Sequence, residues 1–243
     1  MFRTFKADLH IHTCLSPCTE LDMSPKKIVA VAKEKEIDIV GICDHNSSEN
    51  SLATIKAAKK MNIHILPGME VTSQEEVHVL GLFEEIEEVL KLQDYVYENL
   101  PGENDEEVFG MQVMLNEKDE VLGFNKKLLI GATTIPLEEI IGVIHSFNGI
   151  AIASHIDRES FSVVGQLGFI PDNLELDALE ISPYITLEEA KKRFNNKYPF
   201  TSFSDAHYPD DIGKVFTYFL LKRGTVSEIK KALKNEDGRK LIH

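Results

Sequence analysis

Ala7-Asp8-Leu9-His10-Ile11-His12 ends a predicted strand that begins at Arg3, and it carries two candidate metal ligands. Successive side chains of a strand point to opposite faces, so both imidazoles lie on one face. A His-x-His pair becomes a metal site only when other parts of the fold supply further ligands. The alternative is a pair of surface histidines, and the His and acidic residues later in the chain argue against it. The stretch therefore predicts a fold that gathers ligands from distant segments.

Strands and helices alternate about six or seven times along the chain. Hydrophobic patterning predicts strands over 37–43, 63–66, 150–154, 177–181, 200–203 and 215–221, and helices over 25–35, 48–61, 84–99, 136–147, 186–194 and 227–234. The nearly continuous apolar run over 37–43 is typical of a strand covered on both faces in a parallel sheet. Polar residues follow several strands, and in a βα barrel these positions form the rim where active sites assemble.

Two β-hairpins interrupt this alternation. The strands over 70–73 and 76–82 are joined by a polar turn, and their pairing brings Glu70 close to His78. A second hairpin is predicted over 109–124, where a polar turn lies at the middle of the segment. We interpret it as a small insertion into the barrel.

Length and composition indicate one domain. A chain of 243 residues, 43% of them hydrophobic, can form one sizeable core, so we expect a single domain over residues 1–243. No apolar run approaches the length of a bilayer, and no signal-like segment opens the chain, so we expect a cytoplasmic protein without a membrane partner. The cysteines Cys14, Cys18 and Cys43 are an odd number, which indicates free thiols or metal ligands.

The formal net charge of -14 indicates which classes of partner the chain is expected to bind. Duplex nucleic acid is bound largely by Lys and Arg side chains that neutralise phosphates, so the acidic composition predicts no duplex nucleic acid partner. A small anionic substrate remains compatible with this charge if bound cations reverse the local field.

The polar residues at strand ends form a set of candidate ligands. They are His10, His12, His45, Glu70, His78, His155, Asp205 and His207, with Cys18 and Glu20 nearby. The set is too large for one ion, and imidazole and carboxylate ligands suit Zn, Mn or Fe. Glu70 or Asp205 is expected to bridge two ions. His64 and His145 have no ligand partners in their segments, and we interpret both as ordinary hydrogen-bonding residues of the core.

Five segments in order resemble the motifs of the PHP (polymerase and histidinol phosphatase) family. They are Asp8-Leu-His-Ile-His12, Cys43-Asp-His-Asn46, Gly68-Met-Glu70, Ser154-His155 and Ser204-Asp-Ala-His207. The resemblance implies a distorted (β/α)7 barrel, here with the hairpin insertion around residues 109–124. It also implies two or three divalent metal ions and the hydrolysis of phosphate esters.

The resemblance further implies how the ligands divide among the ions. The first ion takes His10, His12, Glu70 and Asp205, and Glu70 bridges to a second ion held by His78 and His155. His45 and His207 hold the third. A histidine that completes this third site in some members is replaced here by Cys18, so Cys18 completes the site, Glu20 substitutes, or the site is partly occupied. Asp8 and Asp44 either orient the neighbouring imidazoles or are plain acids at strand ends.

The leading hypothesis is a metal-dependent phosphoesterase in which an activated hydroxide attacks phosphorus. Glu70, Asp205, His207 and Arg158 are the expected catalytic residues. Arg158 is expected to bind the phosphate, unless it pairs with Asp157 or Glu159. The expected substrate is small: a phosphomonoester such as histidinol phosphate, a nucleoside 3',5'-bisphosphate or a short RNA end.

The alternatives to a phosphoesterase are an amidohydrolase-like hydrolase of a non-phosphate bond and a non-catalytic metal-binding PHP module. The sequence does not indicate the oligomeric state.

Overall fold

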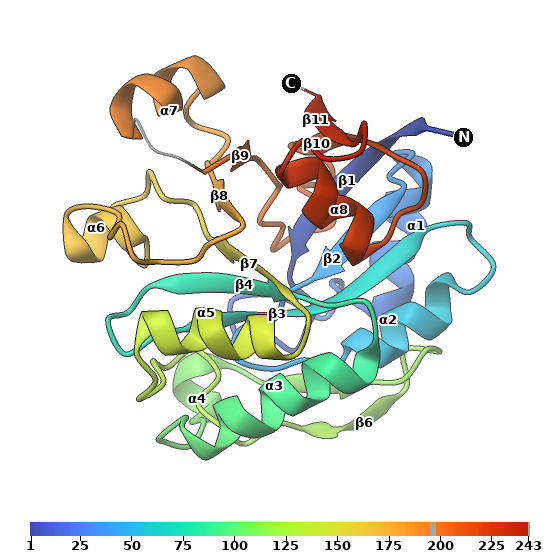
Figure 1. Cartoon of the computed structure of the whole chain (residues 1–243). Coiled ribbons are helices and arrows are strands. Elements are labelled where there is room, and N and C mark those ends of the chain that lie inside the picture. The colour runs from blue at the N-terminus through green and yellow to red at the C-terminus, as the bar shows by residue number, and fades with distance from the viewer. Residues whose placement is uncertain (195–197, 243) are drawn as a thin grey trace.

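A single large sheet organises the fold (Figure 1). The computed structural model describes residues 1–194 and 198–242. Among these residues the large sheet has the strand order β11-β10-β1-β2-β3-β4-β7-β8-β9, and β5 and β6 form a separate sheet. The strands are β1 (Arg3–Ile11), β2 (Ile39–Ile42), β3 (His64–Thr72), β4 (His78–Leu82), β5 (Val113–Leu115), β6 (Val121–Phe124), β7 (Ile150–Ala153), β8 (Ala178–Glu180), β9 (Phe200–Thr201), β10 (Thr217–Leu221) and β11 (Lys240–Ile242).

The strands of the large sheet do not all run in the same direction. Strands β1, β2 and β3 are parallel, as are β7, β8 and β9, whereas β4 runs antiparallel to both of its neighbours. Near the end of β1, the His12 N–H donates to Ala206 O at 3.0 Å, which joins β1 to the segment after β9. The predicted α/β, barrel-like fold is confirmed, and the sheet is a curled half-barrel. The sheet is not a regular series of seven βα units, because a hairpin rather than a helix connects β3 to β4.

Helices cover both faces of the sheet. They are α1 (Pro25–Glu34), α2 (Ser51–Ala58), α3 (Ile86–Glu98), α4 (Glu106–Phe109), α5 (Leu137–Ser146), α6 (Val163–Leu167), α7 (Leu187–Phe194) and α8 (Val226–Leu233). Alternation along β4 separates two apolar cores. Val79 packs in the cluster that includes Leu92 of α3 and Ile144 of α5, whereas Leu80 packs in the cluster that includes Ile229 of α8. Figure 1 shows α3 and α5 on the same side of the sheet.

The second hairpin is present as predicted. Strands β5 and β6 pair antiparallel, and α4 precedes them. Asn50 anchors β5, because its side chain donates to Val113 O at 3.0 Å and accepts from Leu115 N at 2.8 Å. The short elements α6 and β11 were not predicted. Within residues 1–194 and 198–242, no helix combines the length and apolar character needed to span a membrane.

Candidate metal centre

The structure brings every residue that was predicted as a metal ligand to one edge of the sheet. The side chains come from the end of β1, from β3, and from the residues that follow β2, β7 and β9. Because β4 runs antiparallel, its first residue, His78, lies at this same edge. The backbone of Glu70 bonds to both sides of His45, since Glu70 N–H donates to Asp44 O and Asn46 N–H donates to Glu70 O. Long-range pairing of this kind gathers the ligands.

The Glu70 carboxylate lies at the centre of the cluster and is 1% exposed. Its Oε1 faces His78 Nδ1 at 3.1 Å, His10 Nε2 at 3.4 Å and His155 Nε2 at 3.5 Å. Its Oε2 faces His45 Nδ1 at 3.2 Å and His12 Nε2 at 3.5 Å. Both oxygens are therefore surrounded by imidazole nitrogens, which suits a carboxylate that bridges two ions.

Asp205 is the second buried carboxylate. Its Oδ1 lies 3.3 Å from His10 Nε2, 3.2 Å from His12 Nε2 and 3.7 Å from His207 Nδ1. The two β1 histidines are themselves adjacent, with 3.2 Å between their Nε2 atoms, as the alternation of side chains predicted. The other oxygen of Asp205, Oδ2, pairs with Arg158 Nη1 at 2.7 Å. The sequence had offered Asp157 or Glu159 as partners, but Asp157 accepts from Ser182 instead.

Both carboxylates are held in the charged form. Burial alone would raise the pKa of the Glu70 carboxyl, but the imidazoles of His78 and His10 lower it well below its usual range. The same competition lowers the pKa of Asp205, where burial is outweighed by the charge of His10 and by a hydrogen bond from His12. Two buried anions surrounded by imidazole nitrogens have the charge and donor atoms that divalent cations require.

The donor spacing fits bound metal ions. Two ligands of one tetrahedral zinc ion, each about 2.0–2.1 Å from the metal, lie about 3.3–3.4 Å apart. The five distances from Glu70 to imidazole nitrogens, between 3.1 and 3.5 Å, match this spacing. Four buried polar atoms of the cluster also lack hydrogen-bond partners: His45 Nδ1, Glu70 Oε1, His78 Nδ1 and His155 Nδ1. Such atoms are costly to bury unless another partner satisfies them, and a bound cation would do so.

Cys18 lies in this cluster, with its sulfur within 4.8 Å of ligand nitrogens of His12, His45 and His207. Removal from water raises the pKa of a thiol, but hydrogen bonds from His207 and His45 outweigh this effect and lower the pKa of Cys18 to about 7. Among the described residues, Glu20 belongs to no such group of ligand atoms. Cys14 differs, because burial raises the pKa of its thiol to about 12.

Glu180 is an important residue that the sequence analysis missed. The ring Nδ1–H of His10 donates to the Glu180 carboxylate, at 3.0 Å from Oε2 and 3.1 Å from Oε1. A carboxylate in this position fixes the ring so that Nε2 faces the metal centre. The available signal was an acidic residue at the end of the apolar strand Asp177-Ala-Leu-Glu-Ile181.

Asp8 and Asp44 support the centre indirectly, through other groups. Asp44 accepts from Ser16 Oγ at 2.7 Å, and this Oγ in turn lies 3.1 Å from His12 Nδ1. Asp8 accepts instead from the backbone N–H groups of Ser204 and Gly213. Asp44 thus acts on His12 through a hydroxyl, whereas Asp8 holds the segment that carries Asp205.

A pocket of about 320 Å³ opens onto the cluster. Its lining includes Glu70, His78, His155, Asp205 and His207 of the cluster, and also Ile130, Arg158 and Phe161. The side chain of Arg158 is 36% exposed, so its guanidinium is accessible to a ligand in this pocket. Substrate can therefore approach the cluster from this side.

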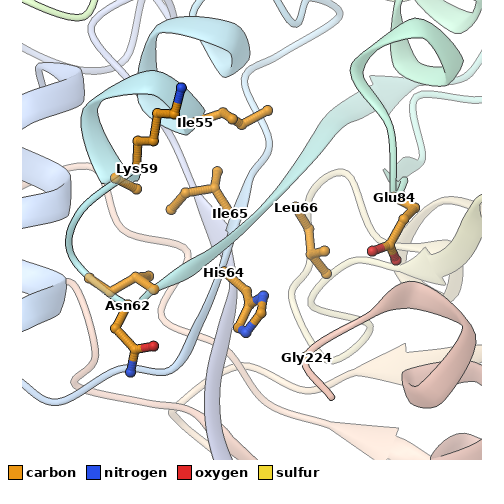
Figure 2. A pocket seen from close by; sticks show the side chains of 10 residues that line it. Ile55, Lys59, Asn62, His64, Ile65, Leu66, Glu84 and Gly224 are labelled. Carbon is orange, nitrogen blue, oxygen red and sulfur yellow. The ribbon is translucent and has the colours of Figure 1, made fainter.

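His64 and His145 lie away from the cluster. His64 was wrongly predicted to be a core residue: it is exposed and lines a separate pocket of about 230 Å³ with Lys59, Asn62 and Glu84 (Figure 2). His145 Nε2 forms a hydrogen bond with Asp177 Oδ2 at 2.9 Å, as a structural residue does. The sheet thus has ionisable groups at both edges, but among the described residues ligand clusters of His, Cys, Asp and Glu occur only at the edge of Glu70.

Solved structures show the same fold. The chain is similar to the lesion-specific endonuclease Q of Pyrococcus furiosus, with a TM-score of 0.72, 21% identity, and coverage of 98% of this chain and 58% of the endonuclease. It is also similar to a putative metal-dependent phosphoesterase of Bifidobacterium adolescentis, with a TM-score of 0.58, 17% identity, and coverage of 95% and 96%.

Sequence comparison also found a relative, and the match covers only part of its length. An uncharacterized protein of Methanocaldococcus jannaschii is 35% identical over 86 residues, which cover 32% of this chain and 50% of that protein. The match thus spans half the length of this relative, and the chain spans 58% of endonuclease Q. The division of the chain into domains stays a prediction.

The prediction that excluded duplex nucleic acid was wrong. A structure of endonuclease Q contains a 27-mer duplex with an abasic lesion at the active site, and it matches this chain with a TM-score of 0.71, 22% identity, and coverage of 98% of this chain and 58% of the endonuclease. A formal net charge of -14 is an average over the whole chain, and it does not describe the field at one face or at a bound cation. Net charge therefore cannot exclude this partner class.

Sequence comparison identifies the family. A model of the PHP domain matches residues 8–167, which is more than half of the chain. The matched region contains the motifs that supply His10, His12, His45, Glu70 and His155 to the cluster. The chain belongs to the PHP domain family.

Proposed function

We propose that this protein hydrolyses a phosphate ester with the help of two or three divalent metal ions, Zn, Mn or Fe. The observation that carries the proposal is the position of the Glu70 carboxylate, which lies within 3.5 Å of nitrogens of His10 and His12 and also of His78 and His155. A buried carboxylate with both oxygens surrounded in this way is suited to hold two ions close together. Paired ions are a frequent device of phosphate-ester hydrolysis.

The proposed ligands divide into three groups. His10, His12 and Asp205 hold one ion, His78 and His155 hold a second, and Glu70 bridges the two. His45, His207 and Cys18 hold the third. When bound, such ions acidify water to give a nucleophile at neutral pH and stabilise negative charge on the phosphoryl group.

The chain's own residues bind and orient the substrate. Arg158 lines the pocket, and its planar guanidinium can bind two phosphate oxygens at once. To do so it exchanges its contact with Asp205 Oδ2 for the substrate, which leaves Asp205 free to ligate. Glu180 keeps Nε2 of His10 directed at the centre, because its carboxylate holds the opposite nitrogen.

We further propose a small phosphorylated substrate, a phosphomonoester or a nucleoside bisphosphate. The pocket of about 320 Å³ supports this, since small-molecule sites commonly measure about 300–1,000 Å³. A second candidate is a phosphodiester in DNA or at an RNA end. The likeness to endonuclease Q, which covers 98% of this chain, favours this candidate.

Metal analysis coupled to a hydrolysis screen tests the proposal. The protein is purified without chelators and its metal content is measured. It is then assayed for phosphate release from phosphomonoesters and nucleoside bisphosphates, for strand cleavage of an abasic-site duplex, and for hydrolysis of an amide substrate. We expect two or three ions per chain and hydrolysis of phosphate esters only. A metal-free protein that remains inactive after metal addition, or one active only on the amide, would contradict the proposal.

A further inference from the structure

Phe161 adopts an unusual backbone conformation beside the metal centre. Its φ angle is +56°, in the left-handed region that bulky residues rarely occupy. Two contacts hold this loop: the His78 N–H donates to Phe161 O at 2.9 Å, and Ser162 Oγ donates to Arg158 O at 2.6 Å. Backbone strain that is held in place next to a candidate active site is a reason to look for a role of the side chain.

The Phe161 ring extends the metal centre with an aromatic surface. It stacks on the imidazole of His78, with ring centroids 4.7 Å apart and an interplanar angle of 18°. Phe161 nevertheless remains 39% exposed and lines the pocket. An aromatic side chain that is supported on one side and accessible to a ligand can stack against a flat ring.

Ile130 supplies a second apolar side chain to the same pocket from a distant segment. The side-chain amide of Asn46 donates to Leu129 O and to Gly131 O, both at 2.8 Å, and so holds the backbone on each side of Ile130. The Asn46 Oδ1 accepts from Thr72 N at 3.0 Å. Since Asn46 directly follows His45, the same turn positions both a candidate ligand and this apolar wall.

We propose that Phe161 and Ile130 form a binding subsite for the nucleobase of a nucleotide substrate. The inference rests on the proposed function and names its substrate class. Arg158, three residues before Phe161, would bind the phosphate while the base stacks on the Phe161 ring. Stacking on an aromatic side chain accepts any base, because every base has a π face. The base belongs either to a free nucleotide or to the end of a nucleic acid strand.

Binding to the metal-loaded protein tests the subsite without turnover. The probes are the phosphonate analogues of adenosine 5'-monophosphate and of ribose 5-phosphate, which contain no cleavable ester and differ only in the base. Calorimetry should show that the adenosine analogue binds about tenfold or more tightly. Equal affinity of the two analogues for the unmodified protein would overturn the subsite, whatever the variants do.

Variants then test whether the Phe161 ring causes the tighter binding of the adenosine analogue. Phe161→Leu should abolish the preference for the adenosine analogue while the affinity for the ribose analogue changes little, and Phe161→Tyr should keep the preference. The control is Phe169→Leu, because Phe169 is 64% exposed and does not line the pocket. A preference that survives in Phe161→Leu would overturn the role of this ring.

Two further measurements separate this inference from the proposed function. Comparable tight binding of both analogues, with phosphate release intact, would overturn only the subsite. Failure to bind either analogue, with no hydrolysis of any phosphate ester, would overturn the proposed function itself. If a phosphorylated single-stranded oligonucleotide binds more tightly than the free nucleotide, the subsite is supported and its base belongs to the end of a nucleic acid strand. If the free nucleotide binds more tightly, the subsite is supported and its base belongs to a free nucleotide.

Discussion

The two ends of strand β3 each place ionisable residues beside a pocket, but they differ in chemistry. At the carboxyl end, Glu70 is 1% exposed and faces five imidazoles within 3.5 Å. At the amino end, His64 is exposed and packs against Phe5 with ring centroids 6.3 Å apart, while Glu84 already accepts from Val226 N. A pocket with ionisable residues becomes a candidate metal site only where several buried ligands converge without other partners.

The largest expected effect comes from Glu70→Gln. The substitution keeps the volume of the side chain but removes its charge, so it should lower kcat on phosphate esters by about 100-fold or more and reduce the metal content. Steady-state kinetics and metal analysis measure the two effects. The matched control at the other end of β3 is His64→Gln, which should change neither. Equal losses of kcat and metal content in both variants would contradict the proposed difference between the two ends of β3.

Glu180→Gln should have the next largest effect. The carboxylate holds His10 Nδ1, and loss of such an outer partner typically lowers metal affinity or activity about 10–100-fold. Metal titration with a competing chelator measures the affinity. Glu175→Gln is the control, because Glu175 is exposed and lies in the segment that leads to β8. If metal affinity is unchanged in Glu180→Gln, the carboxylate does not orient His10 in solution.

Arg158→Ala should lower kcat/KM for phosphate esters by about tenfold or more, because the phosphate loses a bidentate, charge-assisted contact. The comparison is with Arg223→Ala, an exposed arginine that follows β10 near the pocket of His64. Metal content should stay unchanged in both variants. An unaltered kcat/KM on every active ester would exclude Arg158 from substrate binding.

Cys18→Ala should have the smallest effect of the four. Removal of one ligand from the proposed third site should lower the metal content by about one ion per chain and reduce activity in part. Cys14→Ala is the control in the same loop, because its buried thiol has a pKa of about 12 and does not reach the cluster. Full metal content and activity in Cys18→Ala would show that Cys18 is not a ligand of the third site, and only His45 and His207 would remain as its proposed ligands.

The sequence identified the candidate ligands that the structure brings together, because most of them lie next to a strand with a clear apolar pattern. The runs that became β2 and β7 identify the positions of His45 and His155 by local patterning alone. The hairpin of β3 and β4 was also predictable, and its register, with Thr72 opposite His78, brings Glu70 and His78 together.

Other features depend on contacts between distant segments. Glu180 ends a strand of three residues and gains its role only when β8 lies near His10, 170 residues earlier. The contact of Arg158 with Asp205 could not be predicted for the same reason, since Asp205 lies far along the chain, whereas the alternative partners Asp157 and Glu159 are its neighbours in sequence. Net charge failed as a guide to partners because it contains no spatial information.

Anomalous diffraction from crystals of the metal-loaded protein tests the central claim most directly. Data collected at the absorption edge of the bound metal locate each ion without reference to activity. We predict two peaks in contact with the Glu70 carboxylate, one near His10 and Asp205 and another near His78. A single peak that does not contact Glu70, or peaks only at the His64 end of β3, would contradict the account.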